Sequence, residues 1–164
     1  MRRIKRARRS GLAFVRRLPE AEIRRKRTQD RWSVRDVVAH LVSCDEETIG
    51  RFRLIARGQA DRIFWFESMA DADRFNARTV ARLRRLSLPA LLRRMERAGA
   101  DVVRWLERLP LGALRDPSHR YPVVDWLPTP GWTHVDDHIE EVKTWWRGQA
   151  AGRRTAGVSK RRRP

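Results

Sequence analysis

Two histidines four positions apart, His134 and His138, are the residues of this chain whose type and spacing best suit chemistry. In a helix, a four-residue step places both imidazoles on one face, about one turn apart. A third histidine, His40, lies in another strongly patterned segment, residues 32–41. Three imidazole nitrogens can bind one metal ion and leave a coordination position open for a reactant. The sequence therefore predicts a metal site made of His40, His134 and His138.

A simpler interpretation stays open for each of these histidines, since an amphipathic helix can carry a histidine that only hydrogen bonds to a neighbour. His119 lies in a turn-like Asp-Pro-Ser-His-Arg segment, and we leave it out of the predicted site. Cys44 comes one turn after His40 and could coordinate a soft metal, but we interpret it as a small buried apolar residue. Glu141, three residues after His138, either faces solvent or orients a ligand imidazole.

The elements that must position these residues are helices, because apolar residues recur at three- and four-residue steps along nearly the whole chain. A shorter helix is expected between the second and third of four longer ones. The longer helices are expected over residues 3–18, 33–57, 88–109 and 132–147. The pattern predicts an all-α fold, a four-helix bundle with an additional short helix.

Capping residues define the ends of these helices. Ser33, followed three residues later by Asp36, resembles a capping box at the start of the second long helix. Gly58 is expected to end that helix, and Gly148 the last one. Pro89 suits the first turn of the third long helix.

Residues 110–131 contain five prolines, so we expect a long irregular loop before the last helix, in which residues 121–127 are able to run extended. Loops of this length are often functional. Arg115 and Arg120 are the candidates in this loop for binding an acidic cofactor or substrate.

The length of 164 residues suits a single domain, which we place at residues 1–150, followed by a disordered basic tail over residues 151–164. Cys44 is the only cysteine, so an intrachain disulfide is excluded. No apolar run reaches membrane-spanning length, and the basic N-terminal segment is broken before an apolar region could form. We therefore expect no signal peptide, no membrane partner and a cytoplasmic location.

The net charge of +18 resembles that of a nucleic-acid-binding protein until it is divided along the chain. Residues 1–31 hold 13 basic and 3 acidic side chains, residues 32–146 hold 18 and 17, and residues 147–164 hold 7 and none. The excess is therefore almost entirely terminal. Of the 38 basic residues 34 are arginine, which a compositional bias of the coding genome would partly explain. Nucleic-acid binding is accordingly a secondary hypothesis, confined to the two termini.

Three motifs taken in order resemble the DinB-like superfamily, which includes the YfiT-like proteins and the mycothiol-dependent maleylpyruvate isomerases. They are the segment WSVRDVVAHL at residues 32–41, Asn76-Ala77 before a leucine-rich helix, and His134-x-x-x-His138. The likeness covers about residues 5–148 and implies a four-helix bundle with a metal, zinc or nickel, held by His40, His134 and His138. It also implies a low-molecular-weight thiol as cosubstrate and makes a homodimer plausible. The region from Asn76 to Leu109 also resembles a DfsB/ClbS-like branch of small-molecule-protecting proteins that act without metal.

The leading functional hypothesis is a metal-dependent transferase or isomerase that uses a low-molecular-weight thiol and acts on an electrophilic small molecule. A hydrolase that uses metal-bound water would have the same ligands. Two alternatives lie outside this class: a protection protein that binds a reactive compound without turnover, and a basic helical nucleic-acid binder. The sequence assigns no catalytic residue.

Overall fold

The computed structural model describes residues 1–27 and 32–160. Its long helices are α1 (Arg2–Arg16), α3 (Val34–Ala56), α5 (Leu88–Arg108) and α8 (His134–Lys160). Within the described residues there is no β-strand, only an isolated bridge between Lys26 and Ser33. The predicted all-α bundle is confirmed.

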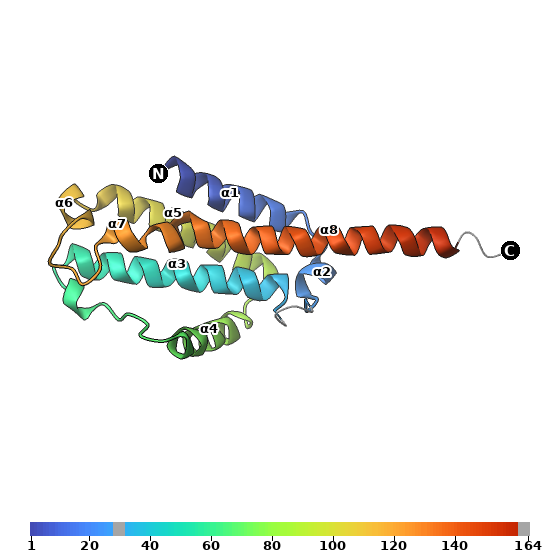
Figure 1. The fold of residues 1–164 in the computed structure, drawn as a ribbon, viewed down its shortest axis with the longest axis horizontal. Helices are drawn as coiled ribbons and strands as arrows, with labels where there is room; N and C mark the ends of the chain where they lie inside the picture. The colour runs from blue at the N-terminus through green and yellow to red at the C-terminus, as the bar shows by residue number, and fades with distance from the viewer. Residues whose placement is uncertain (28–31, 161–164) are drawn as a thin grey trace.

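Helix α3 lies at the centre of the packing, against α5, α4 and α8, while α1 packs on α5 and α8. Figure 1 shows α8 running between α1 and α3, with α5 behind it. One group of buried side chains, including Val38, Leu91 and Val142, fills the part of the bundle near the start of α3. A second group, around Phe52 and Val102, fills the other end. Burial of these apolar faces is the main force that holds the helices together.

The start of α3 is fixed by the predicted capping box. Ser33 Oγ accepts a hydrogen bond from the Asp36 backbone nitrogen at 3.1 Å, and the Ser33 backbone nitrogen donates to Asp36 Oδ2 at 3.0 Å. Arg84 Nε, at the end of α4 (Met69–Leu83), donates to Asp36 Oδ1 at 2.7 Å. Arg35 donates to the backbone oxygens of Arg84, at 2.9 Å, and of Leu86. This part of the sequence therefore both begins α3 and anchors the end of α4.

The proline-rich segment is more regular than expected. It forms short helices α6 (Leu111–Leu114) and α7 (Val123–Trp126) and a π-helical turn at Thr129–Thr133 that leads into α8. Residues 121–127 do not adopt the extended conformation that the sequence allowed, because Pro122 stands at the N-cap position of α7. Pro110 has the same position before α6. At a helix start the missing N–H of proline needs no partner and its fixed φ suits the helix.

The short helix α2 (Glu20–Arg24), which follows Pro19, has no counterpart in the sequence prediction. Gly58, with φ of 67°, follows α3 as expected. Gly148, in contrast, does not end the last helix, since α8 continues to Lys160. An interior glycine destabilises a helix by about 1 kcal/mol. The residues that follow Gly148, which are Gln149, Ala150 and Ala151, are good helix formers, so they do not stop the helix.

Figure 1 shows α8 projecting beyond the other helices. Residues 151–160, which the sequence assigned to a disordered tail, belong to α8 in the structure. The rest of that tail, residues 161–164, lies outside the described part of the chain. Among the described residues, no helix combines the length and apolar character needed to cross a bilayer.

Candidate metal centre

The three predicted histidines meet between α3 and α8. His40 lies in the second turn of α3, and His134 and His138 lie in the first two turns of α8. His40 Nε2 is 3.0 Å from His134 Nε2, which is in turn 3.1 Å from His138 Nε2. The rings of His40 and His138 stand nearly perpendicular, with centroids 5.1 Å apart. His134 Nε2 therefore lies within 3.1 Å of the Nε2 atoms of both other histidines.

Hydrogen bonding alone does not account for this convergence. A ring nitrogen carries either one hydrogen or one lone pair, so His134 Nε2 can form an N–H···N bond with one of its two neighbours but not with both. Two nitrogens bound to one tetrahedral zinc ion lie about 3.3 Å apart, given bonds of about 2.0–2.1 Å. The Nε2 distances of 3.0 and 3.1 Å are close to that value. The donor set thus fits a metal ion.

The site keeps the imidazoles of His40 and His134 neutral, as metal binding requires. Burial, together with the neighbouring His134 and His138, lowers the pKa of His40 from 6.5 to about 3. Burial and His138 lower the pKa of His134 to about 4. Near neutral pH both rings therefore offer a lone pair.

Neighbouring side chains orient two of the rings. The carboxylate of Glu141 lies 3.2 Å from His138 Nδ1, so it can accept the Nδ1 hydrogen and leave Nε2 unprotonated. An interaction with the side chain of Asn76, on α4, acts to raise the pKa of His40, against the larger effect of burial. The ring of Trp32 packs on His40 at a centroid distance of 5.1 Å. Of the two interpretations of Glu141, the structure favours the orienting role.

Cys44 lies beside the histidines, although the sequence analysis interpreted it only as a small buried apolar residue. Its Sγ is 3.8 Å from both Nδ1 and Nε2 of His40, and His40, Cys44 and His134 form a group whose potential ligand atoms lie within 4.8 Å of one another. Burial raises the pKa of the Cys44 thiol to about 12. The sulfur is equidistant from the two nitrogens of His40, whereas the contact of His134 is with Nε2 of His40 at 3.0 Å.

A family model of the DinB superfamily matches residues 3–142. The chain belongs to the DinB superfamily. This DinB-superfamily protein matched no curated protein and no solved structure. Membership confirms the resemblance noted from the sequence motifs, and the His40–Cys44–His134 group is a candidate metal site in this family member.

Other residues singled out from the sequence lie elsewhere. Arg115 follows Leu114, which packs on the second buried group, beside Phe52 in the later part of α3. Arg120 is exposed and stacks on Tyr121 at 5.4 Å. The structure therefore does not bring either arginine to the histidines, and their role in binding an acidic cofactor stays a prediction. His119 Nε2 faces Asp116 at 3.7 Å and takes no part in the described histidine cluster.

Sequence reasoning missed Arg51, which lies on the same face of α3 as Cys44. Arg51 lies seven residues after Cys44, two turns along the same face of the helix. Its guanidinium carbon is 4.3 Å from the ring centre of Trp65 and 5.5 Å from that of Trp126, and Nε is 3.3 Å from a carboxylate oxygen of Glu47. The seven-residue spacing from Cys44 was the available signal, but the aromatic partners come from distant segments.

Proposed function

We propose that this protein binds zinc or nickel through His40, His134 and His138 and acts as a low-molecular-weight-thiol-dependent transferase or isomerase on an electrophilic small molecule. The observation that carries the proposal is the convergence of three Nε2 atoms, with neighbouring distances of 3.0 and 3.1 Å, between α3 and α8. Membership of the DinB superfamily supports it, because the characterised branches that the motifs resemble use such chemistry.

A bound zinc or nickel ion would supply Lewis acidity that lowers the pKa of a thiol and stabilises its thiolate. The chain's own residues are in states that suit metal binding. His40 and His134 stay neutral, and the Glu141 carboxylate holds the Nδ1 side of His138. Three protein ligands leave room for an exogenous ligand in a tetrahedral site.

Arg51 is the group we assign to substrate or thiol binding in this proposal. Its side chain is 12% exposed, and Trp65, Phe66 and Trp126 surround its guanidinium. A guanidinium held against aromatic faces is preorganised to pair with a carboxylate. The aromatic rings also offer an apolar surface for the organic part of the substrate. In this account Arg51 is a positioning residue and does not itself transfer protons.

The test is an S-transfer assay with zinc-loaded protein, 1-chloro-2,4-dinitrobenzene as the electrophile, and mycothiol and glutathione as separate thiols. We expect thiol-dependent turnover that is lost in His134→Ala and retained in His119→Ala, a matched histidine outside the cluster. Arg51→Met should raise KM for an acidic thiol more than it lowers kcat. Stoichiometric binding of the electrophile without turnover would instead favour a protection protein, and turnover that persists in His134→Ala would contradict the proposal.

A further inference from the structure

A partly open cavity lies between α1, α3, α5 and α8, on a different side of α3 and α8 from the histidines. Its volume is about 380 Å³, within the range of roughly 300–1,000 Å³ that is typical of small-molecule pockets. Leu41 and Val135 line it, and these residues directly follow His40 and His134 in the chain. Successive residues of a helix point about 100° apart, so the cavity and the histidine cluster share two helices but occupy different faces.

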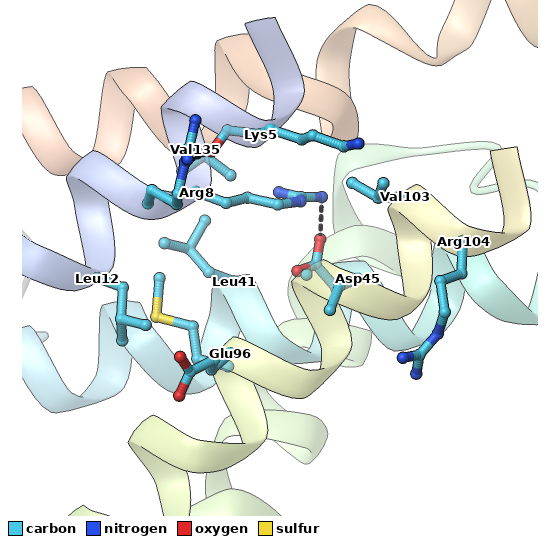
Figure 2. Close-up of a pocket in the computed structure, with 13 residues that line it drawn as sticks. Lys5, Arg8, Leu12, Leu41, Asp45, Glu96, Val103, Arg104 and Val135 are labelled. Carbon is cyan, nitrogen blue, oxygen red and sulfur yellow. Dashed lines mark hydrogen bonds and ion pairs between the residues drawn. The ribbon is translucent and has the colours of Figure 1, made fainter. Parts of the chain in front are cut away.

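The wall of this cavity is mainly apolar. Leu12 from α1, Leu41 from α3, and Met95 and Val103 from α5 contribute side chains to it, and Val135 closes it from α8. Figure 2 shows these side chains around the space that separates α1 from α5. Such a lining favours an aliphatic or aromatic group over a sugar or nucleotide.

One charged side chain crosses this apolar space. Arg8 extends from α1 and pairs through Nη2 with Asp45 Oδ1 at 2.5 Å, as Figure 2 shows. The two side chains are only 11% and 6% exposed. Nη2 also donates to the backbone oxygen of Pro130 at 3.2 Å. The remaining guanidinium nitrogens, Nε and Nη1, are buried and have no hydrogen-bond partner among the described residues.

Buried donors without a partner are unfavourable, and for a charged group the penalty is larger than for a neutral one. An anionic ligand would satisfy Nε or Nη1 of Arg8 with a charge-assisted hydrogen bond. The other basic side chains that line the cavity already have partners: Lys5 pairs with Glu107, Arg104 pairs with Asp101, and Arg9 Nε donates to the Lys5 backbone oxygen. The free nitrogens of Arg8 are therefore the feature that favours an anion.

We propose that this cavity is a second binding site that takes a small apolar carboxylate, with the carboxylate on the free nitrogens of Arg8 and the hydrocarbon part against Leu12, Leu41 and Met95. The site is distinct from the histidine cluster, and the inference does not rest on the function proposed for that cluster. Its ligand class is a medium-chain fatty acid or an aromatic acid of similar size.

The test is calorimetric titration of the metal-free protein with octanoate, in the presence of a chelator so that binding to a metal ion is excluded. Octanol serves as the neutral matched ligand, and acetate as the ligand without a hydrocarbon chain. We expect octanoate to bind with one-to-one stoichiometry and at least about tenfold more tightly than either control. Octanol binding as tight as that of octanoate, or no octanoate binding, would overturn the proposal.

Two variants locate the site. Ala100→Phe places a ring at an exposed position that lines the cavity, and Arg8→Leu/Asp45→Asn removes the ion pair without changing the net charge. Removing both partners avoids leaving one buried charge alone. Each should weaken octanoate binding by at least about tenfold, whereas Arg93→Leu, which removes an exposed positive charge of α5 outside the lining, should not. If folded Arg8→Leu/Asp45→Asn protein, verified by circular dichroism, binds octanoate like the wild type, the assignment is refuted even if Ala100→Phe does not fold.

Discussion

The Nε2 atom of His134 lies 3.0 Å from the Nε2 atom of His40, although the two residues are 94 positions apart in the chain. The contact joins α8 to α3, and His138 joins it from the next turn of α8 at 3.1 Å from His134. His134 Nε2 thus lies within 3.1 Å of both other Nε2 atoms, and these spacings are close to the separation of two nitrogens bound to one zinc ion.

Two substitutions distinguish whether Cys44 or His138 is the third metal ligand beside His40 and His134. We expect Cys44→Ala to retain zinc affinity within about twofold, because Sγ is 3.8 Å from both nitrogens of His40 and is not directed at the point where the Nε2 atoms meet. We expect His138→Ala to weaken zinc binding by more than about 100-fold, since loss of a ligand exceeds the 10–100-fold effect of an outer partner. Competition titration with a chromophoric zinc chelator measures both. The reverse order of effects would make His40, Cys44 and His134 the ligands.

Glu141 should tune the site without being a ligand. Its carboxylate lies 3.2 Å from His138 Nδ1, but the side chain is 56% exposed. We therefore expect Glu141→Gln to lower zinc affinity by roughly tenfold, the lower end of the range for such partners. Glu140→Gln is the matched control, because Glu140 pairs with Lys143 and not with a histidine. Equal affinities of the two variants would show that Glu141 does not orient His138.

Much of this arrangement could be predicted from the sequence, because it follows from local patterns. The i, i+4 pair His134 and His138 and the capping residues Ser33 and Asp36 act within one or two helical turns, so their spacing alone indicates their geometry. Arg51 could not be assigned in this way, since its aromatic partners Trp65 and Trp126 come from segments that only the tertiary fold brings to α3.

The short helices of the proline-rich segment could not be predicted from the sequence for a different reason. Proline both breaks a helix and begins one, and position in the helix decides which. Pro110 and Pro122 precede α6 and α7, each of four residues, too short for an apolar period to be recognised in the sequence. Val123 of α7 is buried in the second group of apolar side chains, and this tertiary packing is not visible in the local sequence pattern.

Asp36 should give the fold a pH-dependent contribution. Burial alone would raise its pKa, but hydrogen bonds from Arg84 and Ser33 to the carboxylate lower the pKa below the usual 3.8. The ionised form is therefore favoured in the folded state, and its stabilisation is present above pH about 4 and is lost as the pH falls through the lowered pKa.

We accordingly expect Asp36→Asn to reduce the free energy of unfolding at pH 7 by about 1–3 kcal/mol, the range for hydrogen bonds to a charged group. The difference from the wild type should shrink below pH about 3.5. Urea denaturation followed by circular dichroism at several pH values measures it. Asp71→Asn, in the first turn of α4 where the carboxylate accepts a hydrogen bond from Ser68 Oγ, is a control with a smaller expected loss. A wild-type-minus-variant difference that does not change with pH would contradict this role of Asp36.

The central claim is that His40, His134 and His138 hold a metal ion, and elemental analysis tests it most directly. Wild-type protein and the variants His119→Ala and His40→Ala/His134→Ala/His138→Ala are exposed to zinc or nickel, dialysed and analysed, with folding verified by circular dichroism. We expect about one ion per chain in the wild type and in His119→Ala, and none in the folded triple variant. Equal metal content in all three proteins, or none in the wild type, would contradict the metal centre.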